Sequence, residues 1–122
     1  MSTYEYGVRY TTQFGRGITS ERNDDTLHDR TANFQWCRTC RIWQEEHGLP
    51  KDATLMRRLP GGEWEEDPHS AAEIQAWDEY AARINALHDS GDVQAAVDAR
   101  NSRDRWLAER VQELLAAAGE AR

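Results

Sequence analysis

The sequence contains little lysine, only two cysteines and no long apolar run. Lys51 is the only lysine among 15 basic residues, so nearly all of the cationic side chains are arginine. No stretch approaches the roughly 18 apolar residues of a membrane-spanning helix. Residues 1–17 lack the apolar segment of a secretory signal peptide. We therefore expect a cytoplasmic protein that has no membrane partner.

Aromatic residues and acidic charge are what the chain does have. Five Trp among 122 residues favour a folded domain, because disordered chains are poor in aromatic side chains. The length allows one domain with a modest core. The net charge is −7, and residues 67–122 alone carry 11 acidic and 6 basic residues, a net charge of −5. Since an acidic surface repels phosphate groups, we expect no direct binding to nucleic acid.

The first half of the chain has the pattern of a small sheet. Residues 4–13 alternate aromatic or apolar side chains with polar or small ones, which predicts a strand, and residues 14–17 predict a turn. Ile18 then begins a short second strand or leads into the following helix. A Pro-Gly-Gly turn joins a strand predicted at 53–59 to a short one at 63–66, which favours a hairpin.

A helix is predicted from about residue 20 to residue 47. Thr19 and Ser20 are candidate N-caps, because a side-chain oxygen there accepts a hydrogen bond from a free backbone N–H group. Gly48 and Pro50 predict the end, since glycine readily adopts the left-handed conformation after the last turn and proline cannot continue a helix. The side chains expected on one face of this helix are Leu27, Phe34, Trp36, Cys37, Cys40, Trp43 and His47.

Residues 67–122 predict two helices joined by a short connection. The first begins with a capping box, in which Ser70 and Glu73 satisfy each other's backbone N–H groups. A Ser-Gly pair ends this helix and Asp92 caps the next one, so the two helices are expected to be antiparallel neighbours. The polar stretch 101–105 is expected to be a bend or a solvated turn of helix.

Together these elements predict an α+β fold. Residues 1–66 form a small antiparallel sheet of two or three strands that is packed by one helix, because so small a sheet needs something to cover one face. Residues 67–122 form a C-terminal antiparallel helical hairpin. We expect the two parts to pack into one compact unit.

Three short motifs follow one another in residues 4–66. They are a Tyr6-Gly7-Val8-Arg9 strand, a helix with Trp36 and Trp43, and an Arg57-Arg58 strand that ends in Trp64-Glu65-Glu66. In this order they resemble a class of small uncharacterised accessory proteins encoded by phages of actinobacteria. The preference for arginine over lysine fits the same GC-rich source. The resemblance covers about half of the chain. It implies a phage or prophage setting and transfers no catalytic residue, since that class has no common assigned activity.

Cys37 and Cys40 lie in a Trp-Cys-x-x-Cys motif that has three interpretations. In thioredoxin-like proteins such a motif carries a redox thiolate at a helix N-terminus, but here the pair falls within a helix and no strand leads into it. A zinc site would need four ligands, with His47 and either His28 or His69 beside the cysteines. In the third interpretation both cysteines are small apolar core residues, as free cysteines commonly are.

An aromatic stripe on the helical hairpin is the candidate partner-binding site. Trp77 and Ile84 repeat at helical spacing, Tyr80 lies one step around, and Trp106 is out of register with the apolar positions of the last helix. The extra rings either pack within the protein or form an interface with a partner or a second copy. The surrounding charges are interpreted as a solvated face: Glu73, Asp78, Glu79, Arg83, Arg103 and Arg105.

The leading hypothesis is a non-enzymatic phage or prophage accessory protein that binds, and inhibits or modulates, a host or defence protein. We expect no enzymatic activity and no cofactor, because the sequence has no Ser/His/Asp spacing and no Gly-rich phosphate loop. One version of the hypothesis is an acidic decoy that occupies a nucleic-acid groove of its target. The alternative is a zinc- or thiol-dependent module that uses Cys37 and Cys40. A DNA-binding face at Arg57 and Arg58 is disfavoured by the net charge.

Overall fold

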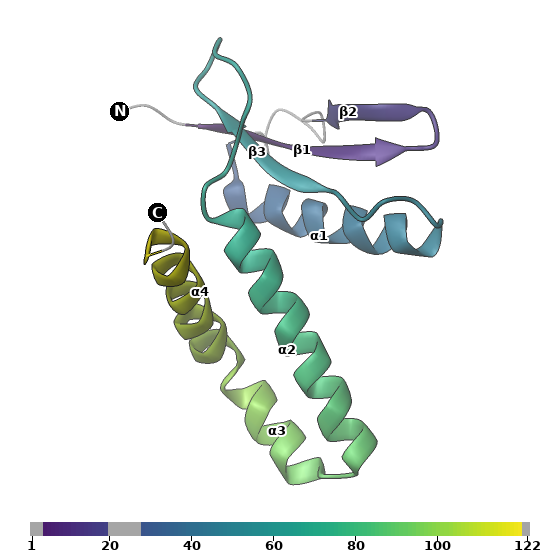
Figure 1. The fold of residues 1–122 in the computed structure, drawn as a ribbon, viewed down its shortest axis with the longest axis vertical. Helices are drawn as coiled ribbons and strands as arrows, with labels where there is room; N and C mark the ends of the chain where they lie inside the picture. The colour runs from purple at the N-terminus through teal and green to yellow at the C-terminus, as the bar shows by residue number, and fades with distance from the viewer. Residues whose placement is uncertain (1–3, 20–27, 121–122) are drawn as a thin grey trace. The chain divides into compact units, whose positions relative to one another are not determined.

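The computed structural model describes residues 4–19 and 28–120 (Figure 1). The chain forms two compact units, Met1–Ser70 and Ala71–Arg122. The first contains strands β1 (Glu5–Thr12), β2 (Gly15–Thr19), β3 (Thr54–Arg58) and β4 (Glu65–Glu66), together with helix α1 (Arg30–Glu46). The second contains α2 (Ser70–Ser90), α3 (Val93–Asn101) and α4 (Arg103–Glu120). The predicted α+β class is thereby confirmed.

The four strands form one antiparallel sheet in the order β2-β1-β3-β4. It has one or two strands more than the sequence predicts. Ile18 lies in a second strand, where it pairs with Arg9, but this strand begins at Gly15, inside the predicted turn 14–17. Gly15, with φ +124°, permits the tight turn between these strands. The predicted hairpin is confirmed as well, since Arg57 of β3 pairs with Glu65 of β4.

Helix α1 lies along one face of the sheet and forms the core of the first unit with it (Figure 1). Val8 of β1 and Leu55 of β3 are directly opposite each other in the sheet, and both are completely buried. Phe34 and Cys37 are buried on α1. The alternation that predicts the first strand thus places Val8 in the core.

The start of α1 differs from the prediction. Its N-cap is Asp29, whose side chain accepts a hydrogen bond from the N–H group of Ala32 at 3.1 Å. Thr19 is not an N-cap because it belongs to β2, where it pairs with Val8. Ser20 lies outside the described residues. The end of the helix is predicted correctly, since Gly48 follows the C-cap with φ +67°.

The buried face of α1 is more polar than the sequence predicts. Asn33 and Gln44 are buried there, whereas Trp36 and Trp43 are only half-buried and His47 is exposed. Phe34, Cys37 and Cys40 are buried as expected, and Leu27 lies outside the described residues. The helix therefore turns part of its aromatic stripe away from the core.

The second unit is a helical hairpin in which α2 runs antiparallel to α3 and α4 (Figure 1). Helix α2 begins at Ser70, where its start is predicted. Asp92 caps α3 by accepting a hydrogen bond from the Ala95 N–H group at 3.0 Å, as expected. The predicted bend is found at Ser102, which ends α3 and accepts the first hydrogen bond of α4 from the Trp106 N–H group. No helix within the described residues is long and apolar enough to cross a membrane.

Candidate functional site

Three aromatic side chains of the second unit form the hairpin aromatic cluster: Trp77 and Tyr80 of α2 and Trp106 of α4. The rings of Trp77 and Tyr80 meet edge to face with centroids 6.0 Å apart. The Tyr80 and Trp106 rings are 6.1 Å apart. Both separations are typical of favourable aromatic pairs. All three side chains are only half-buried, so the cluster joins the two helices and also presents ring surface to solvent.

An ion pair holds α4 beside α2 next to the cluster. Arg110 of α4 donates to the carboxylate of Glu79 on α2, with an Nη2–Oε1 distance of 3.0 Å, and also to Glu113 one turn along α4 at 3.1 Å. Glu79 precedes Tyr80 directly, so this pair links the two helices at the level of the rings. The sequence assigns Glu79 to a solvated face. Its side chain is 36% exposed, and its carboxylate also connects the two helices.

Two arginines lie over rings of the cluster. The guanidinium carbon of Arg83 is 5.7 Å from the centroid of the Trp106 ring, and that of Arg103 is 5.6 Å from the Trp77 ring. Cations at this distance from an aromatic face are attracted by its quadrupole. Both arginines are exposed, in agreement with the predicted solvated face. Their contacts with the two tryptophan rings are not predicted by any pattern of neighbouring residues.

A shallow hollow of about 320 Å³ lies beside the cluster. Trp77 forms one side of it, and α4 contributes the other residues apart from Glu73. Leu107 is the buried residue in this lining, while Ala108 is exposed at its edge. Ile84, the fourth residue predicted for partner binding, is half-buried one turn after Tyr80 on α2 and does not line the hollow. The structure thus brings three of the four predicted residues together.

The two cysteines lie in the interior of α1, where both are buried and neither forms a disulfide. Burial raises the pKa of the Cys37 thiol to about 12, with Arg41 opposing that rise and Cys40 adding to it. A thiol in this state is not a nucleophile near neutral pH. Within the described residues no three His, Cys, Asp or Glu side chains come close enough to hold a metal ion. The geometry therefore favours the interpretation of both cysteines as core residues.

Two of the three histidines offered as zinc ligands have other partners in the described part of the chain. The Nδ1 atom of His28 lies 3.4 Å from the Tyr4 carbonyl oxygen. The Nδ1 atom of His47 lies 2.8 Å from the carbonyl oxygen of Trp43, and its ring packs against the Trp43 ring at 4.6 Å. His69 is exposed in the turn before α2.

Arg57 and Arg58 are each paired with an acid rather than presented as a basic face. Arg57 bonds to Glu65 at 2.8 Å and lies 4.3 Å from the Tyr4 ring centroid. Arg58 bonds to Glu5 at 3.1 Å and lies 4.4 Å from the Trp64 ring. These pairings remove the excess positive charge that phosphate binding requires.

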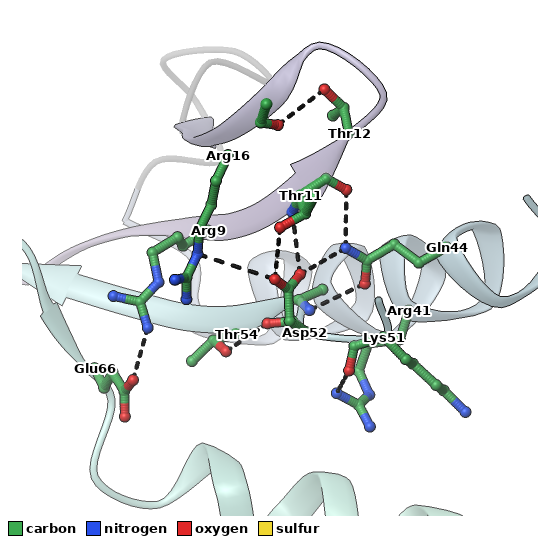
Figure 2. Close-up of polar contacts among 12 residues, drawn as sticks. Arg9, Thr11, Thr12, Arg16, Arg41, Gln44, Lys51, Asp52, Thr54 and Glu66 are labelled. Atoms are coloured by element: carbon green, nitrogen blue, oxygen red, sulfur yellow. Dashed lines mark hydrogen bonds and ion pairs between the residues drawn. The ribbon is translucent and has the colours of Figure 1, made fainter. Parts of the chain in front are cut away.

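Asp52 of the first unit is a carboxylate with several hydrogen-bond partners, and its contacts are structural (Figure 2). It accepts hydrogen bonds from the Thr11 N–H group at 3.0 Å, the Thr11 hydroxyl at 2.6 Å and the Gln44 amide at 2.8 Å. Partial burial raises its pKa, but the bonds from Thr11 and Gln44 and the nearby Arg16 outweigh this effect and hold the pKa below 3.8. A carboxylate so fully engaged does not act as a general base near neutral pH.

Comparison of the chain with protein-family models, with curated proteins and with solved structures finds no match. The surfaces of the molecule itself are therefore the basis for assigning a function. Among them the hairpin aromatic cluster combines half-buried tryptophan and tyrosine rings, two arginines and an adjoining hollow. Tryptophan, tyrosine and arginine are the residue types that contribute most to binding at protein interfaces.

Proposed function

We propose that this is a non-enzymatic accessory protein that acts by binding another protein, and that the hairpin aromatic cluster is its contact surface. The observation that carries the proposal is the half-burial of all three rings of the cluster within their own unit. Each ring has a partner inside the hairpin and still leaves apolar area in water. Covering that area would add about 25 cal/mol for each Å² removed from solvent.

The charges around the cluster support a selective interface. The centre holds rings and two arginines, whereas the rim carries Glu73, Asp78 and the Glu79–Arg110 pair. An aromatic centre with a polar, charged rim is the usual layout of a protein interface. The net charge of −5 in residues 67–122 favours a partner whose facing surface is basic, because complementary charge speeds association and excludes wrong partners.

We further propose that the partner is a host or defence protein of an actinobacterium, bound by a phage or prophage product. This setting is supported by the resemblance of residues 4–66 to small phage accessory proteins and by the near-absence of lysine. A second copy of the chain would use the same surface. The two occupants differ in a simple measurement, because a homodimer has twice the 14.0 kDa mass of one chain in sedimentation analysis.

The test is a variant that blocks the hollow without touching the packed rings. Ala108 is exposed and lines the hollow, so Ala108→Arg places a long charged side chain in it. Ala117 is also exposed on α4, but it lies on the opposite face of the helix from Ala108 and does not line the hollow. Ala117→Arg is therefore the matched control. Alanine and arginine both favour helix, and neither change should unfold the hairpin.

Tagged protein is used to capture partners from lysate of an actinobacterial host, and the captured proteins are quantified by mass spectrometry. We expect one stoichiometric partner with the wild type and with Ala117→Arg, and about tenfold less with Ala108→Arg, equivalent to about 1.4 kcal/mol. Equal recovery with both variants would remove the hollow from the interface. An eluate without any partner, from a protein that also sediments as a single chain, would contradict the binding proposal.

A further inference from the structure

We propose that the first unit carries a separate binding pocket for a small, uncharged aromatic molecule. The pocket has a volume of about 330 Å³ and lies between β1, the turn that follows it and α1. We call it the aromatic pocket, and four rings line it: Tyr10, Phe14, Trp36 and Trp43. It belongs entirely to Met1–Ser70 and shares no residue with the hairpin aromatic cluster.

The pocket follows from the way α1 covers the sheet. Tyr10 lies two residues beyond the buried Val8 on β1, so the two side chains emerge on the same face of the sheet. On α1, Trp36, Cys40 and Trp43 repeat at spacings of four and three and line one side of the pocket. Cys40 is buried, whereas the Tyr10, Trp36 and Trp43 side chains are only half-buried. These side chains line a space of about 330 Å³.

Phe14 adds the strongest sign that the pocket is incomplete without an occupant. Its side chain is 90% exposed at the tip of the β1–β2 turn. The turn is held in place because the Phe14 N–H group donates to the Thr12 hydroxyl oxygen at 3.1 Å, and that hydroxyl donates to the Gly15 carbonyl at 3.1 Å. A phenylalanine fixed in water beside three other rings gains free energy when an apolar surface covers it.

The lining selects the chemistry of the ligand. None of the eight described residues that line the pocket carries a charge. A charged group entering it would lose its hydration without gaining an ion pair. Rings attract cations, but this described lining lacks the carboxylate that would reinforce such binding. A planar aromatic ring gains offset-stacked or edge-to-face contacts with the lining rings. The exposed Gln13 amide is available for one polar substituent.

Volume and hydrogen bonding favour a free molecule over a side chain of a peptide. A cavity of about 150 Å³ accommodates benzene. The aromatic pocket, at about 330 Å³, therefore has room for two fused rings with a substituent. A bound peptide also needs partners for its backbone. The hydroxyls of Thr12 and Thr39 in the lining already donate to the carbonyls of Gly15 and Gln35.

The test uses indole as the probe and the full-length protein labelled with ¹⁵N. Each of the five tryptophans gives one side-chain N–H signal in NMR, and Trp→Phe variants assign them. We expect the Trp36 and Trp43 signals to shift and saturate as indole is added. Trp64, Trp77 and Trp106 do not line the pocket, so their side-chain N–H signals should not shift. Absence of a saturable shift, or equal shifts of all five signals, would overturn the proposal.

Two variants test the location of the probe. Phe14→Ala should weaken indole binding about tenfold, because it removes one ring of contact. Thr39→Arg should weaken indole binding at least as much, because it fills the pocket with a charged side chain. This second variant keeps the test valid if Phe14→Ala disturbs the turn. Ile42→Ala is the control, since Ile42 is 55% exposed on α1 and does not line the pocket. Unchanged binding in both pocket variants would overturn the proposal.

Two further probes test the ligand class. Tetramethylammonium should produce no saturable shift. If it binds as tightly as indole, the ligand of the pocket is a cation and the assignment to an uncharged molecule is wrong. The capped tripeptide Gly-Trp-Gly should bind more weakly than indole. If it binds more tightly, the pocket receives a peptide side chain and the assignment to a free molecule is wrong. None of these results depends on the hairpin, so failure here leaves the protein-binding proposal intact.

Discussion

Replacing Gln44 by leucine should destabilise the first unit strongly, because one buried amide connects three segments of the chain. Gln44 is completely buried in α1. Its Nε2 atom donates to the Thr11 carbonyl at 3.0 Å and to Asp52 at 2.8 Å, and its Oε1 atom accepts from the Ala53 N–H group at 3.0 Å (Figure 2). Leucine has a similar size, so Gln44→Leu removes these bonds without opening a large cavity.

The expected cost can be worked out bond by bond. The Ala53 N–H group is buried and would lose its acceptor, which costs about 1–3 kcal/mol. The Thr11 carbonyl is partly buried and would lose a bond worth about 0.5–1.5 kcal/mol. Asp52 keeps its two bonds from Thr11 and contributes little. The sum is about 1.5–4.5 kcal/mol, a large share of the roughly 5–15 kcal/mol by which a domain is stable.

Gln35→Leu is the matched control. Gln35 is exposed on the same helix, where its Oε1 atom accepts from Arg38 at 3.3 Å. This substitution should change the unfolding free energy by no more than about 0.5 kcal/mol. Urea unfolding is followed through the backbone NMR signals of the first unit, which separates it from the hairpin. If Gln44→Leu costs no more than Gln35→Leu, the three hydrogen bonds do not hold the segments together and the reasoning is wrong.

Three further changes test other parts of the first unit. Asp67→Asn should cost about 1–3 kcal/mol at pH 7, because the charged carboxylate accepts two bonds from Arg30 at 3.0 and 2.9 Å. Burial raises the pKa of Asp67, but the hydrogen bonds from Arg30 outweigh this effect and hold the pKa below its usual value. The wild type should therefore lose stability as the pH falls below about 4. In a pH series of urea unfolding, Asp67→Asn should lose less stability over the same range. Both cysteines are buried, and burial raises the pKa of Cys37 to about 12, so a chromogenic thiol reagent at pH 8 should react with them only in urea. Reaction in the native state would show that the helix opens. Leu55→Ala should cost about 2–5 kcal/mol in urea unfolding, whereas Leu59→Ala, at a residue 45% exposed, should cost well under 1 kcal/mol; equal costs would contradict the assignment of the core.

The features that the sequence predicts correctly depend on neighbouring residues. The turn before Glu65, the glycine that ends α1 and the Asp92 cap each follow from a few adjacent positions. The features that it misses depend on distant ones. Thr11 and Asp52 are 41 residues apart, and Gln44 lies 33 residues from Thr11, so no local pattern announces their contact.

The candidate site divides in the same way. Helical spacing places Trp77 and Ile84 on one face of α2 with Tyr80 one step around, and the structure shows the Trp77 and Tyr80 rings in contact. The contact of Tyr80 with Trp106 is not predicted, because the sequence shows Trp106 out of register with the apolar positions of its helix. The arginines over the rings are not predictable, since a flexible side chain reaches an aromatic face only once the register of α2 and α4 is fixed.

The wrongly predicted face of α1 bears on function. By periodicity Trp36 and Trp43 belong to the core, yet buried positions on this helix are taken by Asn33 and Gln44 while the two indoles remain half-exposed. Gln44 can be buried because all of its polar atoms have partners, and these bonds anchor α1 to the end of β1 and to residues 52 and 53. Fixed in this way, α1 carries its tryptophans beside Tyr10 instead of under the sheet. Places where a local rule is broken and the break is stabilised elsewhere tend to be functional sites. The same hydrogen bonds that make Gln44 costly to remove therefore hold the aromatic pocket open, and Gln44→Leu should weaken indole binding as well as stability.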